Sequence, residues 1–217
     1  MRRAGWRRWG NKSIVSGELK PWGTVLKFRN LLYSVSCLNL IMPKIVYYVA
    51  SSLDGYIAGK DEDISAFIMQ GKGVEKYQAD LAQFSTIIMG RKTYEFGYQY
   101  GLEPGQAAYP NMAHHIFSNH LRFKNQSEAV HIEPLDLSRL QDIRQQATTD
   151  IYLCGGGQFA GWLLENDQID QLKIKLNPIV LGEGTKLFGA SKAKANWKLS
   201  EIESFADGMQ ILTYDKA

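Results

Sequence analysis

The residues best suited to chemistry lie in three short segments, each of which includes or follows an apolar run. The first, residues 50–59 (ASSLDGYIAG), contains one carboxylate, and the second, residues 87–95 (IIMGRKTYE), joins a glycine to basic side chains. The third, residues 151–164 (IYLCGGGQFAGWLL), contains consecutive glycines between a predicted strand and a predicted helix. Turns of this composition can hold anionic groups, and a carboxylate can orient a substrate or move a proton.

The glycine run predicts an anion site built from the backbone. Because glycine has no side chain, Gly155, Gly156 and Gly157 let the backbone approach a phosphate closely and adopt positive φ angles. The helix that begins near Gln158 and Phe159 directs its free N–H groups and positive dipole end at the same place. The spacing is not the G-x-G-x-x-G pattern of a Rossmann fold. A tight turn without a ligand is the alternative.

The basic turn makes a second anion site. Gly90 ends a predicted buried strand, and Arg91, Lys92 and Thr93 open a short helix. Basic side chains are unfavourable at a helix N-terminus, and a bound anion would remove that conflict. A solvated basic turn would explain this segment alone. Two strand–glycine–helix turns in one domain favour a dinucleotide that carries an additional phosphate.

Asp54 is the catalytic candidate, because it is the only carboxylate of the first segment. It could orient a substrate or relay a proton. The alternative is a turn aspartate that bonds to its own backbone.

The elements that would position these turns alternate between strands and helices. Hydrophobic spacing predicts strands at 44–50, 56–58, 86–89, 115–118, 129–132, 150–154 and 168–180, and a closing hairpin at 197–205 and 209–214. Helices are predicted at 74–84, 92–96, 136–147 and 158–165, with a long loop at 97–111. This order predicts an α/β fold with a mainly parallel sheet and a C-terminal antiparallel hairpin.

The composition favours one globular domain, residues 42–217, preceded by a leader. Hydrophobic residues make up 45% and charged residues 22% of the 217 residues. Residues 1–41 hold eight of the 25 Lys and Arg residues and one acidic residue, so the basic charge belongs to the leader. No nucleic-acid surface, membrane span or metal site is expected. The leader is interpreted as disordered or as translated upstream sequence, and two distant cysteines favour a cytoplasmic protein.

Five motifs come in the order typical of the dihydrofolate reductase superfamily. The chain further resembles the C-terminal reductase domain of bifunctional riboflavin-biosynthesis deaminase–reductases and their stand-alone bacterial relatives, over residues 42–217. The resemblance implies a three-layer α/β/α fold, and a homodimer as in related reductases. The motifs are residues 52–58 (SLDGYIA), 89–95 (MGRKTYE), 116–118 (IFS), 155–157 (GGG) and 178–184 (PIVLGEG).

The resemblance also implies NADPH as cofactor and assigns residues to its parts. The adenosine-side phosphates would contact Gly90, Arg91, Lys92 and Thr93, with Ser118 near the adenine ribose and its 2′-phosphate. The pyrophosphate would be bound by Gly155, Gly156, Gly157, Gln158 and Phe159. The nicotinamide pocket would be lined by Ala50 and Ile57, with the main chain of Cys154 close to the ring.

The implied activity is an NADPH-dependent oxidoreductase that transfers hydride to a pterin-like or pyrimidine-like heterocycle. Asp80 lies too close to Gly90 in sequence to be the acid of dihydrofolate reductases. Ala160 replaces the usual tyrosine, and Cys154 replaces the glutamate of riboflavin-pathway reductases. Two alternatives stay open. One is a 5-amino-6-(5-phosphoribosylamino)uracil reductase, and the other is a non-catalytic NADP-binding regulatory or scaffold protein.

Overall fold

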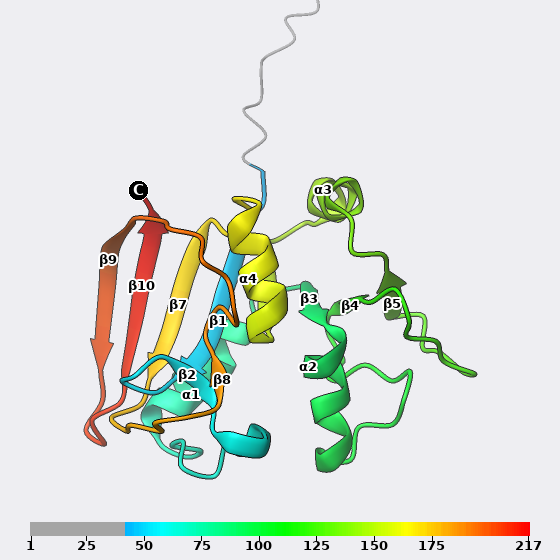
Figure 1. The fold of residues 1–217 in the computed structure, drawn as a ribbon. Coiled ribbons are helices and arrows are strands. Elements are labelled where there is room, and N and C mark those ends of the chain that lie inside the picture. Colours follow the sequence, from blue (N-terminus) through cyan, green and yellow to red (C-terminus); the bar gives the residue numbers. More distant parts are fainter. Residues whose placement is uncertain (1–41) are drawn as a thin grey trace, which may run out of the picture. The chain divides into compact units, whose positions relative to one another are not determined.

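A computed structural model describes residues 42–217, so the predicted leader, residues 1–41, lies outside the described residues. In the described part, one sheet has the strand order β5-β4-β3-β6-β1-β7-β10-β9, and β2 pairs with β8 (Figure 1). The strands are β1 (Ile45–Ser51), β2 (Tyr56–Ala58), β3 (Thr86–Gly90), β4 (Ala113–Phe117), β5 (Val130–Glu133), β6 (Ile151–Gly155), β7 (Gln171–Leu176), β8 (Thr185–Lys186), β9 (Trp197–Ser204) and β10 (Gln210–Lys216). The helices are α1 (Lys72–Leu81), α2 (Arg91–Phe96), α3 (Leu137–Gln146) and α4 (Gly157–Glu165), with 3-10 turns at Lys60–Glu62 and Gly97–Tyr100.

The strands from β5 to β7 are all parallel. β1 pairs in parallel with β6 and β7, and β3 pairs in parallel with β6 and β4. β4 pairs in parallel with β5, whereas β10 and β9 form an antiparallel hairpin against β7. The predicted mainly parallel sheet with a terminal hairpin is confirmed. The carboxyl ends of the parallel strands therefore meet at one edge of the sheet.

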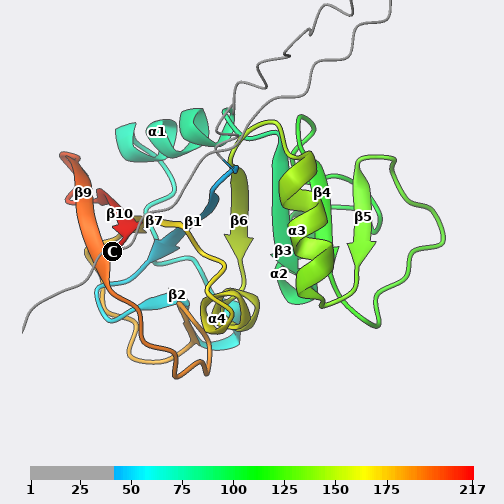
Figure 2. The ribbon, with the colours of Figure 1, turned by 90° about the horizontal axis from the view of Figure 1, so that it is seen from above.

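Helices cover both faces of the sheet, which gives the three layers expected (Figure 2). Leu140 of α3 and Leu163 of α4 pack into one buried cluster with Ile45 and Tyr47. On the opposite face, Leu81 of α1 packs into a second cluster, together with Tyr94 of α2. A central strand buried on both faces must be apolar throughout, which explains the run IVYYVAS of β1.

The strand predicted over residues 168–180 is shorter in the structure. β7 spans Gln171–Leu176, because Asp167 has a positive φ angle in the turn after α4 and Pro178 has no N–H group to donate. The two-residue strand β8 was not among the predicted elements. Within residues 42–217, no helix combines the length and the apolar character that crossing a bilayer requires.

A buried ionic cluster joins α1 to the sheet. Asp80 is 7% exposed, and its carboxylate accepts hydrogen bonds from Lys76 Nζ (2.6 Å), Lys173 Nζ (2.9 Å) and the Tyr48 hydroxyl (3.1 Å). Burial alone would raise the pKa of Asp80, but the hydrogen bonds from the two lysines outweigh it and lower that pKa. The carboxylate is thus committed to Lys76 of α1 and Lys173 of β7, and this arrangement gives it a structural role.

Replacing this carboxylate by an amide, Asp80→Asn, should lower the free energy of unfolding by about 3 kcal/mol, because Lys173 keeps a largely buried charge without its partner. The pKa of Asp80 is lower in the folded chain, so its contribution is present above the unfolded value near 4 and is lost as the pH falls further. Urea denaturation at several pH values would measure both effects. The free energies of unfolding of the wild-type and variant proteins should converge in acid. Asp142→Asn, on exposed α3 surface, is the control and should change stability little.

Candidate functional site

The predicted cofactor residues gather at the carboxyl edge of the parallel sheet. Ala50 lies near the end of β1, Gly90 ends β3, and Cys154 lies one residue before the end of β6. Ser118 directly follows β4. These strands are adjacent in the order β4-β3-β6-β1, so the fold brings together segments that are far apart in the sequence. Ligands of open α/β sheets bind at this edge.

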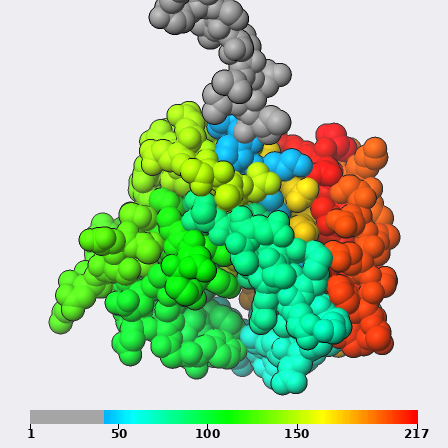
Figure 3. All heavy atoms as spheres, turned by 180° about the vertical axis from the view of Figure 1, so that it is seen from behind, coloured from blue at the N-terminus to red at the C-terminus, as the bar shows by residue number. Residues whose placement is uncertain are grey.

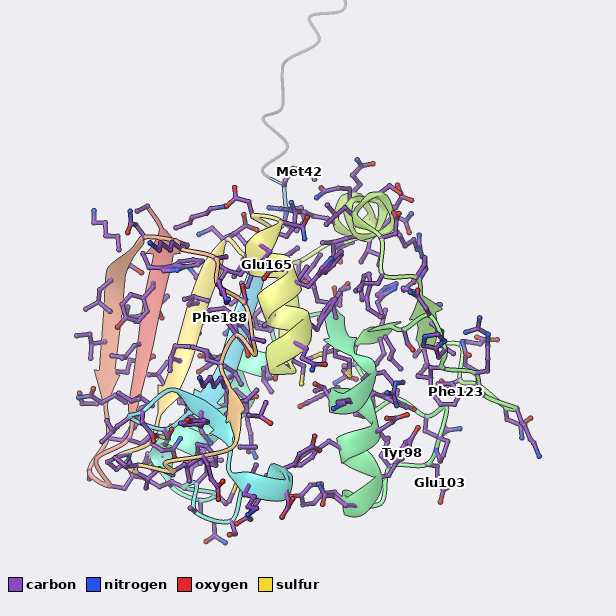
Figure 4. All side chains as sticks on the ribbon, viewed as in Figure 1. Met42, Tyr98, Glu103, Phe123, Glu165 and Phe188 are labelled. Atoms are coloured by element: carbon purple, nitrogen blue, oxygen red, sulfur yellow. The ribbon has the colours of Figure 1, made fainter. Side chains whose placement is uncertain are left out.

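The three consecutive glycines are required for three different reasons. Gly155 has φ +118°, a backbone conformation that residues with side chains rarely adopt. Space is not the reason, because a Cβ there would meet nothing closer than 3.6 Å. A Cβ on Gly156 would lie 2.6 Å from Thr93 Oγ1, and a Cβ on Gly157 would lie 2.2 Å from the carbonyl oxygen of Lys186. Gly157 therefore lets the segment that follows β8 pack closely against α4. Phe188 belongs to that segment (Figure 4).

The starts of α2 and α4 lie against each other. Gly156 precedes α4 and approaches Thr93 in α2, while Gly90 precedes α2 and would place a Cβ 3.0 Å from Phe159 Cβ. The Phe159 ring is buried and stacks on Phe117 with centroids 4.8 Å apart. Only the backbone N–H of Phe159 is thus left for a ligand, whereas the Gln158 side chain is exposed.

Neither helix start is capped by a side chain. Asp136 caps α3 by accepting a hydrogen bond from Arg139 N (3.0 Å), but Gly90 and Gly156 offer α2 and α4 no such acceptor. The first N–H groups of a helix need partners, and they carry its positive dipole end. The two adjoining starts therefore suit the linked phosphates of a dinucleotide, as the glycine cradle at Gly156 also does.

The basic residues of α2 are exposed and differ in their surroundings. Arg91 forms an ion pair with Glu95 one turn later, at 2.6 Å. Lys92 has no carboxylate within ion-pair distance in the described residues. Both side chains line a shallow hollow together with Glu62, Glu95, Phe96 and Gln99. Lys92 is the more available of the two for an anion.

A second hollow lies beyond the carboxyl ends of β4 and β5. It is lined by Ser118 and also by Arg122 and Gln126, which were not predicted. The Ser118 hydroxyl oxygen accepts hydrogen bonds from the N–H groups of His120 (3.2 Å) and Leu121 (3.0 Å), so it orders the turn. No sequence signal marks Arg122, because it belongs to an irregular loop.

The Asp54 carboxylate ties two loops together. It accepts hydrogen bonds from the Ser52 hydroxyl (2.6 Å) and from the N–H groups of Leu181 (3.1 Å) and Gly182 (2.7 Å). The hydrogen bond from Ser52, followed by those from the backbone, lowers the pKa of Asp54 to about 2. A carboxylate of this kind is a poor proton donor near neutral pH, so its geometry favours a structural role over a proton relay. The backbone groups that it bonds lie in a distant loop as well as near its own turn.

Ile57 lies in the middle of β2, which pairs with β8 through Tyr56 and Ala58. It is partly buried, as Ala50 is. Both β2 and β8 are beside the carboxyl end of β1 in Figure 1. The position suits the predicted role of Ile57 beside a nicotinamide ring, which stays a prediction.

One face of the sheet remains open beside this edge. Ala50 and Cys154 belong to central strands and point to the α1 face, yet both are only partly buried. Tyr77 of α1 and Tyr109 of the long loop are also partly buried, and both pack against the second core cluster with Cys154. Figure 3 shows the surface hollowed between the cyan segment of α1 and the green segment that follows α2. A flat ring could lie in this cleft.

Beneath the cleft, three tyrosines contact one another through their rings and hydroxyls. Tyr77 and Tyr152 hydroxyls are 2.7 Å apart, and the Tyr109 ring meets the Tyr152 ring edge-on at 6.0 Å. Burial raises the pKa of Cys154, so its thiol is neutral and unsuited to nucleophilic chemistry. In the described residues, no group of three His, Cys, Asp or Glu side chains could hold a metal ion.

Substituting Asp54→Asn should free the loop at residues 181–182, because an amide has only one oxygen to accept the hydrogen bonds that two oxygens now share. Hydrogen exchange of the Leu181 and Gly182 amides should quicken by about tenfold or more, while β7 amides stay protected. Glu183→Gln on the same loop is the control, because its carboxylate accepts no backbone hydrogen bond. Unchanged exchange at both amides in Asp54→Asn would contradict the loop-tying role.

Comparison with known proteins agrees with this architecture. Residues 43–211 match the family described as the RibD C-terminal domain. The uncharacterized protein YyaP of Bacillus subtilis is 27% identical over 184 residues, which cover 81% of this chain and 96% of YyaP. A proposed riboflavin biosynthesis protein from Shewanella sp. PV-4 has a similar structure, with a TM-score of 0.68 at 24% identity, covering 81% of this chain and 99% of that one.

A larger protein shares the same fold. The diaminohydroxyphosphoribosylaminopyrimidine deaminase/5-amino-6-(5-phosphoribosylamino)uracil reductase of Thermotoga maritima has a TM-score of 0.59 at 14% identity, over 81% of this chain and 57% of that one. At these identities the structures show the fold, whereas the family match spans most of the chain. The chain belongs to the RibD C-terminal domain family.

Proposed function

We propose that this protein is an NADPH-dependent reductase of a pyrimidine-type heterocycle. The observation that carries the proposal is the pair of adjoining, uncapped helix starts at Gly90 and Gly156, which open beside the cleft at Ala50 and Cys154. The first feature suits a dinucleotide and the second suits a flat ring, so the two ligands would meet at the end of β1.

The residues present fit NADPH. The N–H groups at the start of α4 would hold the pyrophosphate, and Lys92 and Thr93 would hold phosphate oxygens on the adenosine side, those of the 2′-phosphate included. Ser118 and Arg122 line the hollow where the ribose and its phosphate would lie. When bound, NADPH would supply the hydride, while the protein orients the substrate and excludes water.

A pyrimidine of the riboflavin pathway is favoured over dihydrofolate as the substrate. Membership in the RibD C-terminal domain family supports a pyrimidine reductase. Asp80 lies too close to Gly90 in sequence to be the acid of dihydrofolate reductases, and its carboxylate is bonded by Lys76 and Lys173. Tyr77 and Tyr109 are partly buried beside the cleft, and their rings can stack on a heterocycle.

Purified full-length protein should oxidise NADPH when 5-amino-6-(5-phosphoribosylamino)uracil is added, and much less when dihydrofolate is added. Loss of NADPH absorbance measures the rate. If NADPH binds but is oxidised with neither the pyrimidine nor dihydrofolate, a non-catalytic NADP-binding protein would be favoured. Failure of NADPH to shift the melting temperature would reject both functions.

The substitution Lys92→Met should raise the Kd of NADPH about tenfold, equivalent to about 1.4 kcal/mol, because one charge-assisted contact with a phosphate is lost. The Kd of NADH should change less, since NADH lacks the additional phosphate. Isothermal titration calorimetry measures both. Lys194→Met removes an exposed lysine elsewhere and is the control. An equal loss of affinity for both cofactors would contradict the role given to Lys92.

A further inference from the structure

A lysine is buried beside the cleft without a carboxylate partner. Lys175 in β7 is 5% exposed, and no described carboxylate lies within ion-pair distance of its amine. Its Nζ donates one long hydrogen bond, 3.3 Å, to the carbonyl oxygen of Ile68, and it lies 5.4 Å from the centre of the Tyr77 ring. A protonated lysine has three donors, so most of its hydrogen-bonding capacity remains unused.

The neighbouring lysine of the same strand shows the usual arrangement. Lys173 points to the same face two residues earlier, and its amine is paired with Asp80 at 2.9 Å. Buried lysines without such a partner are uncommon, because the interior disfavours an uncompensated charge. The contrast between the two lysines indicates that Lys175 meets a requirement other than stability.

The position of Lys175 connects it with the reacting centre. In the sheet register, Lys175 is opposite Ala50 of β1, the residue at the floor of the cleft. Register partners in a parallel pair project to the same face of the sheet, here the face of Tyr77 and Cys154. On its other side Lys175 is opposite Ile211 of β10, which is apolar.

We propose that Lys175 is the proton donor to the substrate, an assignment that rests on the proposed function. As the substrate carbon gains the hydride, the π bond of its C=N or C=O group breaks, and the electron pair passes to the nitrogen or oxygen. That atom takes a proton from the Lys175 ammonium group, whose N–H bond breaks, and water later restores the proton. Lys175 would thus supply the proton that neither Asp54 nor Asp80 is placed to give.

The surroundings make the amine a ready acid. Burial lowers the pKa of Lys175, and Asp207 in the turn between β9 and β10 partly opposes this. The other groups facing it are the Tyr77 ring of α1, the Ile68 carbonyl and the apolar side chains of Ala50 and Ile211. A lysine of lowered pKa releases its proton more readily near neutral pH.

A structural role must be separated from a catalytic one. Asn177 Oδ1 accepts a hydrogen bond from Ile68 N (3.0 Å), so Lys175 and Asn177 both hold the segment around Ile68. Lys175→Arg keeps a charge that can bond the Ile68 carbonyl, but arginine cannot release a proton at accessible pH. Lys175→Met loses both properties. Lys173→Met, on the same strand and face, is the matched control.

Single-turnover oxidation of NADPH by 5-amino-6-(5-phosphoribosylamino)uracil should be about 10²-fold slower or more in both Lys175 variants. In wild type the rate should fall as the pH rises through the pKa of Lys175, and this dependence should vanish in Lys175→Met. Lys173→Met should keep the wild-type rate and pH profile. Recovery of the rate in Lys175→Arg would assign Lys175 to holding the Ile68 segment and overturn the proposal.

A direct titration decides the assignment independently of turnover. In protein labelled with ¹³C at lysine Cε, the signal missing from Lys175→Met identifies Lys175 by NMR. Its titration midpoint should lie below those of the other lysines and should move when NADP⁺ is added. A midpoint among the other lysines, unmoved by NADP⁺, would overturn the proposal. If wild type does not turn over this pyrimidine, the proposed function fails, and this titration alone decides the role of Lys175.

Discussion

The contact between two helix starts is the constraint on which the rest of the site depends. Gly156 can lie against Thr93 only because it has no side chain, and Gly90 accommodates Phe159 for the same reason. This contact requires β3 and β6 to be neighbours, which the parallel pairing provides. A side chain at Gly156 would separate the two sets of free N–H groups. The proposed phosphate site at this edge thus depends on the absence of side chains at Gly90 and Gly156 more than on any charged residue.

Much of this architecture could be predicted from the sequence. Apolar runs ending at Gly90 and at Gly155 located β3 and β6, and the helical spacing of Leu137, Leu140 and Ile143 located α3. Such signals are local, because a strand or helix is specified by its own pattern. The hairpin of β9 and β10 was equally clear, since residues 207–208 supply a turn between two patterned strands.

Other features depended on which strands become neighbours, and no local pattern records that. From the sequence alone, Lys175 is a polar residue in an alternating strand, which predicts an exposed side chain. Its burial follows from the position of β7 between β1 and β10, with helices on both faces of the sheet. The same holds for Tyr77, Tyr109 and Tyr152, whose grouping joins a helix, a loop and a strand. The residue type of Asp54 predicted a catalytic candidate, but the loop whose N–H groups bond its carboxylate lies more than 120 residues later in the sequence.

The pairing of β1 has a consequence for the order in which the chain can fold. β1 is near the start of the described residues, yet its partners β6 and β7 begin at Ile151 and Gln171. Contacts between such distant segments form slowly and leave apolar strands exposed meanwhile. During synthesis, the ribosome must release most of the domain before its central strand can find either neighbour. Until then the apolar run IVYYVAS has no sheet to join, and an unpaired strand of this kind is prone to aggregation.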